Sequence, residues 1–363
     1  MGRSTAISIL FTLTCLCPAG SRAEWDAFGL ADRMIFGLEL SDDRLYACTD
    51  DGVYRRDLSP AASPWVSIGL QTRTVRALLV LSSDTLLAAT ETSPSDRISL
   101  YRTTDAGSSW HAYQNGFGAG GNNPEVAALT RLPHQPATLI AVGSSIEKSL
   151  DAGAKWQARA SGCVFNFVEA NPYATSQVWA GGESCIFSPV LFKSADSGDT
   201  WELFQLDAGG DNACDAVAFH PSAPDVVYVG MEGRIMRTMD GGTQWETLPT
   251  PDPAMYHNGL AISKQLPSRL YLAGSSSPPH PSGIVLHKSD DGGFSWTSVA
   301  QAAPIQFGVF VLVLVSTEGV DTIWLGTDRG IYRYRQVVTA VTSQTWSGVK
   351  SRFRSPGSGA RRP

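Results

Sequence analysis

The stretch Ser194-Ala195-Asp196-Ser197-Gly198-Asp199-Thr200-Trp201 decides the fold, because its pattern, Ser/Thr-x-Asp-x-Gly-x-x-Trp, occurs five times in the 363 residues. The other four copies of this octet occupy residues 103–110, 149–156, 238–245 and 289–296. The octet tryptophans follow one another at intervals of 46, 45, 44 and 51 residues. Fixed positions that recur at such a period are typical of architectures built from one repeated supersecondary unit.

Each octet ends a longer unit, in which a short run of β-forming residues, such as Val227-Tyr228-Val229-Gly230, precedes it. Two further units, around Leu45–Cys48 and Ile323–Gly326, keep this run but lack the octet, which makes seven units of four predicted strands. One basic residue stands at the same place in every unit, and we expect these side chains to be solvated on outer strands. They are Arg55, Arg102, Lys148, Lys193, Arg237, Lys288 and Arg333.

The last unit lacks a fourth strand, and the beginning of the chain supplies a match. Glu24-Trp25-Asp26-Ala27-Phe28-Gly29-Leu30 resembles Pro64-Trp65-Val66-Ser67-Ile68-Gly69-Leu70, the fourth strand of the first unit. Pairing the two ends of the chain removes the exposed sheet edges that an open array would leave. The sequence therefore predicts an all-β fold over residues 24–336, a single seven-bladed β-propeller closed by its N-terminal strand.

The octets resemble the Asp-box, also called the bacterial neuraminidase repeat, and the resemblance covers about residues 24–336. Similar repeats occur in sialidases, xyloglucan-cleaving glycosidases, the sortilin luminal domain and photosystem II assembly factors, so the motif indicates a fold far more than a function. The resemblance implies structural turns between the third and fourth strands, on the face opposite the ligand site. The residues with this implied role are Asp105, Asp151, Asp196, Asp240, Asp291, Trp110, Trp156, Trp201, Trp245 and Trp296.

The two ends of the chain lie outside the repeats. Residues 1–23 combine Arg3, a short apolar run and a small-x-small site, which is typical of a signal peptide cleaved near Glu24. We therefore expect a secreted or periplasmic protein without a transmembrane segment. Residues 337–363 hold five basic residues and no acid, and their Ser/Gly/Pro-rich composition is typical of a disordered tail.

The charge of the propeller region is strongly acidic. Twenty-one of the 28 basic residues and all 34 acidic residues fall between 24 and 336, which gives this region a net charge of −13. Such a balance argues against nucleic acid as a partner. The six histidines show no metal-ligand spacing, and no motif for a cofactor is present.

The predicted ligand face is built from the connections between blades and the hairpins between the second and third strands, where loops on a rigid scaffold commonly bind. His257, beside Tyr256 and Asn258, is one candidate on this face. The basic candidates are Arg33, Arg73, Arg76, Arg234 and Arg329. The carboxylates expected on the same face are Glu125, Glu183, Asp211, Asp215, Glu232 and Asp328.

Two functions are compatible with such a face, and a third possibility is a purely structural surface protein. The preferred hypothesis is a monomeric binding scaffold that recognises a protein segment or a glycan. The alternative is a glycoside hydrolase of sialidase-like geometry, which by resemblance needs an arginine cluster, a tyrosine nucleophile with its glutamate, and an aspartic acid. A hydrolase also needs two carboxylates at a controlled separation, which the sequence does not specify. No catalytic residue is assigned, and a binding role is favoured over an enzymatic one.

Four cysteines follow the predicted signal peptide. Cys163 opens the first strand of the fourth blade and Cys185 follows the second strand, so we expect both on the ligand face and joined in a disulfide. Cys214 is the alternative partner of Cys185, and the sequence does not choose between the two. Cys48 belongs to the first blade across the ring, and we expect it to be a buried free thiol.

Overall fold

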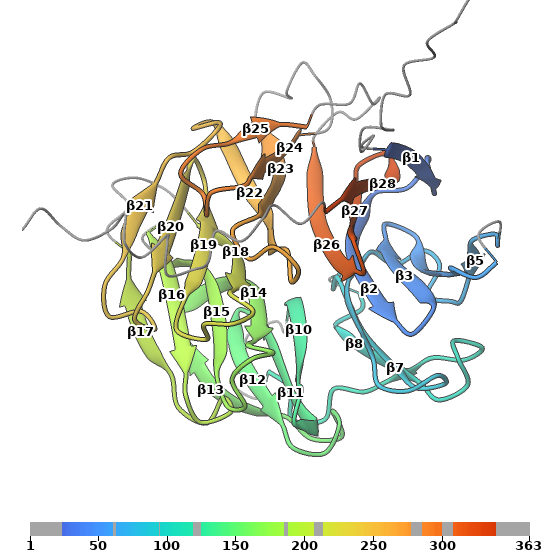
Figure 1. Ribbon diagram of the computed structural model, residues 1–363. Helices are drawn as coiled ribbons and strands as arrows, with labels where there is room; N and C mark the ends of the chain where they lie inside the picture. The colour runs from blue at the N-terminus through green and yellow to red at the C-terminus, as the bar shows by residue number, and fades with distance from the viewer. Residues whose placement is uncertain are drawn as a thin grey trace, which may run out of the picture.

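The protein is described by a computed structural model over residues 24–60, 63–93, 95–118, 125–184, 188–206, 213–276, 285–299 and 308–338. Within these residues, 28 β-strands form seven four-stranded sheets, and none of the described residues is helical. The sheets stand around a common centre like the blades of a propeller (Figure 1). The all-β, seven-bladed architecture predicted from the repeats is confirmed.

The first four blades each follow chain order from the innermost strand outward. Blade one is β2 (Ile35–Ser41), β3 (Arg44–Thr49), β4 (Gly52–Asp57) and β5 (Val66–Ser67). Blade two is β6 (Val75–Val80), β7 (Leu86–Thr90), β8 (Leu100–Thr103) and β9 (His111–Ala112). Blade three is β10 (Val126–Leu132), β11 (Gln135–Gly143), β12 (Ser145–Ser149) and β13 (Gln157–Ser161). Blade four is β14 (Cys163–Ala170), β15 (Val178–Ser184), β16 (Pro189–Ser194) and β17 (Glu202–Gln205).

The remaining blades differ only in the last, which takes its outer strand from the start of the chain. Blade five is β18 (Cys214–Phe219), β19 (Val227–Met231), β20 (Arg234–Thr238) and β21 (Glu246–Leu248). Blade six is β22 (Met255–Ile262), β23 (Leu270–Ser276), β24 (Val285–Ser289) and β25 (Thr297–Ser298). Blade seven is β26 (Val309–Thr317), β27 (Val320–Thr327), β28 (Gly330–Val337) and β1 (Glu24–Gly29).

The ring closes where β1 pairs with β28, as the sequence predicted (Figure 1, dark blue beside red). In this antiparallel register Trp25 lies opposite Tyr334, and the two rings pack with centroids 4.9 Å apart. Arg333 donates from Nη2 to Asp26 Oδ2 at 2.7 Å across the same strand pair. Residues more than 300 positions apart thus complete one sheet, and the ring has no open blade.

The five octets form the same hydrogen-bonded turn on the face where the third and fourth strands connect. In blade four, the Gly198 amide donates to Ser194 Oγ at 2.7 Å, and this hydroxyl donates to Asp196 Oδ1 at 2.8 Å. The same carboxylate oxygen accepts the Thr200 amide at 2.9 Å. Gly198 has a φ of 87°, in the left-handed region that favours glycine. Ser194, Asp196 and Thr200 therefore each form a hydrogen bond within the turn.

In blades one, two and six, the tryptophan that precedes the fourth strand donates a hydrogen bond to the blade before it. The Trp110 Nε1–H donates to the Ile68 carbonyl of blade one at 2.8 Å, and Trp296 donates to the Pro249 carbonyl of blade five at 3.0 Å. Trp65 makes the equivalent bond to the Phe28 carbonyl at 2.9 Å, across the closure of the ring. At these three junctions the indole ring buries apolar area between sheets while its N–H is satisfied. Trp201 instead donates within its own turn, to the Gly198 carbonyl at 3.2 Å, and the buried N–H groups of Trp156 and Trp245 have no hydrogen-bond partner among the described residues.

The prediction that the seven basic repeat residues are solvated was wrong for at least two of them. Lys148 and Arg237 are each only 3% exposed. Lys148 Nζ lies 2.9 Å from Asp199 Oδ1 in the octet of the next blade, and Lys193 Nζ donates to the Gly241 carbonyl in the octet after that at 2.6 Å. The alkyl stems cross the interface between blades, which buries them, and the charged ends reach the neighbouring turn.

The octet carboxylates make the stability of the ring sensitive to acid. Hydrogen bonds from turn groups outweigh burial and lower the pKa of Asp196 to about 2, compared with about 3.9 in an unfolded chain. A carboxyl with a depressed folded pKa stabilises fully above the unfolded pKa and loses that contribution as the pH falls through the folded pKa. The Tm deficit of Asp196→Asn should therefore be largest near neutral pH, decrease as the pH falls below about 4, and disappear only below the folded pKa of about 2. Thermal unfolding across this range measures it, with Glu202→Gln, an exposed acid outside the octets, as the control. A deficit of Asp196→Asn that is constant with pH would contradict the assignment.

Candidate functional site

A β-bulge interrupts the beginning of every innermost strand. The register with the second strand shifts at seven equivalent places: Ile35/Gly37, Val75/Ala77, Val126/Ala128, Phe165/Phe167, Cys214/Ala216, Tyr256/Gly259 and Val309/Val311. A bulge leaves its extra residue out of the ladder and redirects its side chain. The residues left out that face the centre form what we call the bulge ring: Phe36, Arg76, Ala127, Asn166, Asp215, Asn258 and Phe310.

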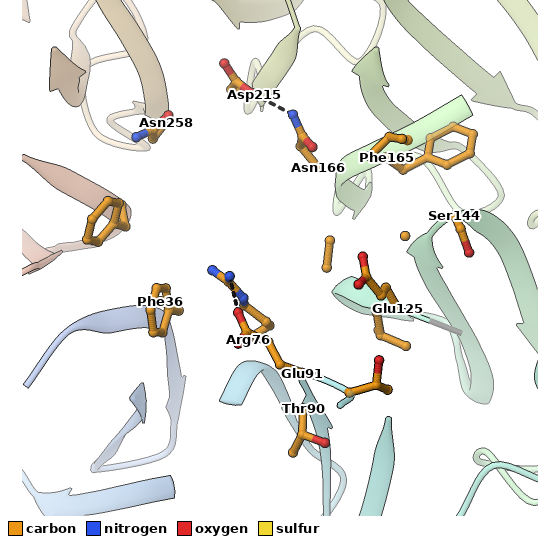
Figure 2. Close-up of a pocket in the computed structure, with 16 residues that line it drawn as sticks. Phe36, Arg76, Thr90, Glu91, Glu125, Ser144, Phe165, Asn166, Asp215 and Asn258 are labelled. Carbon is orange, nitrogen blue, oxygen red and sulfur yellow. Dashed lines mark hydrogen bonds and ion pairs between the residues drawn. The ribbon is translucent and has the colours of Figure 1, made fainter. Parts of the chain in front are cut away.

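The bulge ring surrounds a cavity of about 620 Å³ at the centre of the propeller. Every innermost strand contributes to its wall, and Figure 2 shows the labelled side chains approaching this space from different blades. Glu91, Glu125 and Val164 add to the wall between ring positions. Because the innermost strands begin on the face where blades are connected, the cavity lies on the predicted ligand face.

One side of the ring is aromatic and cationic. Phe36 and Phe310 stack with centroids 5.9 Å apart and planes inclined by 25°. The Arg76 guanidinium carbon lies 4.4 Å from the centroid of the Phe36 ring, a cation–π geometry. Arg76 also forms an ion pair with Glu91, which is drawn as a dashed line in Figure 2. The charge of Arg76 is therefore balanced by its own blade, and Phe36 is covered by Arg76 and by Phe310.

The facing side of the ring is polar. Asn166 donates from Nδ2 to Asp215 Oδ1 at 2.9 Å, which joins blades four and five (Figure 2). Asn258 donates to Ser275 Oγ at 3.0 Å and to the Val309 carbonyl at 2.9 Å, which holds its side chain between blades six and seven. Both contacts fix the amide groups in place, so this wall is preorganised.

Asp215 is the most perturbed acid of the cavity. Its Oδ2 is buried and has no hydrogen-bond partner among the described residues. Burial raises the pKa of Asp215 to about 7, the Asn166 hydrogen bond opposes this, and the nearby Glu232 and Glu183 raise it further. The Asp215 carboxyl therefore changes its charge state near neutral pH. The neighbouring Glu232 and Glu183 give its surroundings a negative potential.

The structure does not gather the five predicted arginines. Only Arg76 lines the cavity. Arg33 and Arg73 lie in the connections before β2 and β6, and each pairs with an acid in the hairpin between the second and third strands of its blade, Arg33 with Asp51 at 2.8 Å and Arg73 with Asp96. Arg329 lies 4.0 Å from Asp328. These pairs are spread around the rim, and the side chains stabilise the hairpins locally. Arg234 contributes its carbonyl to a contact with His257.

His257 lies in the bulge of β22 and is fully buried against blade five. Its Nδ1 lies 3.0 Å from the Arg234 carbonyl and close to the Met231 carbonyl, and its Nε2 lies 3.3 Å from Thr250 Oγ1. Burial lowers the pKa of His257 to about 4, so the ring is neutral at physiological pH. The neighbouring Asn258, and not His257, reaches the cavity.

Four of the six predicted carboxylates lie in or near the cavity. Glu125 and Asp215 line the cavity, and Glu183 and Glu232 lie close enough to raise the pKa of Asp215. Asp328 is 6% exposed beside Arg329, and Asp211 lies outside the described residues. Within the described ranges, no three His, Cys, Asp or Glu side chains are arranged to hold a metal ion. No described helix has the length and apolarity to cross a membrane.

The structure describes three of the four cysteines that follow the predicted signal peptide. Cys163 opens β14 and pairs in the ladder with Ser184, the last residue of β15. Cys185 lies outside the described residues, so both disulfide pairings remain predictions. Cys48 is a free thiol, 1% exposed, and burial raises its pKa. Cys214 is also fully buried.

Comparison with known proteins supports the fold. No family model matches the chain. A xyloglucanase of Hypocrea jecorina (strain QM6a) is 26% identical over 168 residues, 46% of this chain and 19% of that protein, so the chain spans about a fifth of the length of this curated relative. An ancestral GH74 enzyme superposes with a TM-score of 0.60 at 17% identity, over 72% of this chain and 36% of that one. YCF48 bound to D1 peptide superposes with a TM-score of 0.62 at 18% identity, over 87% and 97% of the two chains. The chain therefore shares the seven-bladed propeller fold with both a peptide-bound protein and a glycosidase.

Proposed function

We propose that this protein is a binding scaffold whose bulge ring receives a segment of another protein. The observation that carries the proposal is the central cavity, which takes one redirected side chain from each of seven blades and combines an aromatic, a cationic and an amide-lined wall. Concave sites with a mainly fixed wall and a few convergent polar groups are typical of ligand recognition. The bound peptide of the similar YCF48 structure is consistent with this use of the fold.

The aromatic pair favours a protein segment over a glycan. Sugar rings are recognised by stacking on an open aromatic face, whereas Phe36 has Arg76 over one face and stacks on Phe310. The amide groups of Asn166 and Asn258 suit the peptide backbone, because an amide carries both donors and an acceptor.

The proposal also covers the family, the export and the oligomeric state of this scaffold. We infer from the octets that the chain is an Asp-box protein, and from residues 1–23 that it is exported and released by cleavage near Glu24, the first residue of β1. Cleavage at that point leaves the closing strand intact. The protein acts as a monomer, and residues 339–363 of the predicted basic tail lie outside the described residues.

Filling the cavity is expected to abolish binding without unfolding the ring. Ala127 is the small member of the bulge ring, so Ala127→Trp places an indole in the cavity. Peptides selected from a displayed library against the purified protein should bind this variant at least about tenfold more weakly, a loss of about 1.4 kcal/mol. Val66→Trp, which adds the same side chain to the exposed outer strand β5, is the matched control. Selected peptides that bind both variants as well as the wild type would place recognition elsewhere.

A glycoside hydrolase is the second candidate, and one arrangement favours it. Tyr256 lies beside Glu232, which raises the pKa of its phenol, and Asp215 is close to both. These are the tyrosine, glutamate and aspartic acid that the sialidase resemblance requires, and a carboxyl with a pKa of about 7 suits a general acid. The arginines, however, are dispersed around the rim.

We expect no turnover of fluorogenic sialosides or common β-glycosides above the blank. The measurement is a fluorescence assay with the purified protein and with Asp215→Asn. Turnover in the wild type that disappears in Asp215→Asn would establish the hydrolase and overturn a purely binding role.

A further inference from the structure

We propose that the peptide segment received by the bulge ring is cationic, and that a lysine or arginine side chain enters the cavity toward Asp215. The proposal rests on the proposed function and specifies the chemistry of its ligand. It follows from the charges of the wall, from the way those charges are already paired, and from the shape of the ring.

The wall of the cavity carries unbalanced negative charge. Three carboxylates line it, Glu91, Glu125 and Asp215, and among the described lining residues Arg76 is the one cation. Glu91 forms an ion pair with Arg76, so the charge of that cation is already matched within blade two. Glu125 and Asp215, on blades three and five, remain without a lining cation, and a cation that enters beside Asp215 would favour its charged form.

Further acids deepen this negative region. Glu183 and Glu232 raise the pKa of Asp215, and Glu232 and Asp215 raise that of Tyr256. Farther along the innermost strands, burial and the nearby Glu169 raise the pKa of Glu39 to about 7, while Arg131 opposes them. Carboxylates that raise one another's pKa share a region of negative potential, and an entering cation would relieve that repulsion.

The wall of the cavity has an apolar part and a polar part, which match the two parts of a lysine or arginine side chain. Such a side chain has an apolar stem and a charged end. Val164, which is 51% exposed, and Phe310 give the cavity apolar wall, and Asp215 with the Asn166 amide gives a polar end. An anionic segment would meet Glu125 and Asp215 with no uncompensated cation in the described wall.

The test compares peptides of the same length that differ in the charge of their side chains. Fluorescein-labelled hexapeptides alternate glycine with lysine, arginine, norleucine or glutamate, and anisotropy measures their affinity for the purified full chain. Norleucine keeps the stem of lysine and lacks its charge. We expect the lysine and arginine peptides to bind at least about tenfold more tightly than the norleucine and glutamate peptides. Asp215→Asn, which keeps the shape and the Asn166 contact, should weaken the cationic peptides at least about fivefold, as for loss of a charge-assisted bond.

Asp84→Asn is the matched control, because Asp84 is an exposed acid in the hairpin between β6 and β7, away from the cavity. Equal weakening by Asp84→Asn and Asp215→Asn would mean that the acidic surface attracts cations generally, and would overturn the inference. Norleucine or glutamate peptides that bind best, and lose binding in Ala127→Trp, would refute the cationic ligand while the peptide scaffold stands. Failure of all four peptides to bind, together with selected library peptides that ignore Ala127→Trp, would remove the proposed function itself.

Discussion

Deletion of residues 24–30 is expected to abolish the cooperative unfolding of the protein and to cause self-association. The deletion removes β1, the outer strand of blade seven, and exposes the edge of β28. It also removes Phe28, which is 5% exposed, packs against Trp65 and Trp324, and accepts the Trp65 indole N–H at its carbonyl. Both blade seven and its junction with blade one lose their packing, and an exposed strand edge is a template for association with another chain.

Thermal denaturation and size-exclusion chromatography measure the effect. The peptide Glu24-Trp25-Asp26-Ala27-Phe28-Gly29-Leu30, added in trans, should restore a cooperative transition, because it supplies the missing strand. A scrambled peptide of the same composition is the control. A truncated protein that stays monomeric with an unchanged Tm would show that ring closure does not depend on this strand.

Gly274→Ala is expected to destabilise the ring by about 3 kcal/mol, near the upper end for overpacking a core. A Cβ at Gly274 would lie 1.8 Å from the Tyr256 carbonyl oxygen. The same relation recurs at Gly143, where the Glu125 carbonyl would be 1.9 Å away, and at Gly182, where the Val164 carbonyl would be 1.9 Å away. In blades three, four and six, therefore, a glycine of the second strand lets the bulged start of the first strand approach closely.

The substitution should disturb recognition as well as stability. The Tyr256 carbonyl cannot move without shifting the start of β22, which carries Asn258 of the bulge ring. Denaturant unfolding gives the stability change, and affinity for selected peptides gives the effect on the ring. Gly162→Ala is the control, since its Cβ would meet nothing within 4 Å and only its φ of 96° is strained, which costs about 1 kcal/mol. Equal losses in the two variants would mean that close approach of the strands is unimportant.

The sequence predicted the architecture because its signals are local and repeated. The octet is a self-contained turn whose hydrogen bonds join residues no more than four positions apart, as at Ser194, Asp196 and Gly198, so the same letters form the same structure in every blade. The closing strand was found for a related reason, since residues 24–30 repeat the letters of an existing fourth strand.

The candidate site was only partly predictable. Arg76 and Asp215 were expected on the ligand face, but Phe36, Asn166 and Phe310 were not singled out. The signal that could have found them is a residue just after a buried position near the start of each first strand, such as Phe36 after Ile35. Connections of different length precede that position, so no fixed spacing from the octets marks it. The spacing also does not show whether an arginine reaches the cavity or pairs with an acid of a nearby hairpin, as Arg33 does with Asp51.

By itself, the sequence determined the number of blades, the octet turns and the identity of the strand that closes the ring. Only the tertiary structure decided which side chains meet at the centre. The seven bulges lie on strands about 45 residues apart, and their side chains converge because the sheets are radial and each bulge turns one residue out of its ladder. The burial of Lys148 was decided in the same way, by the face of the next blade. Local patterns specify turns and strands, whereas convergence at an axis depends on how whole sheets pack against one another.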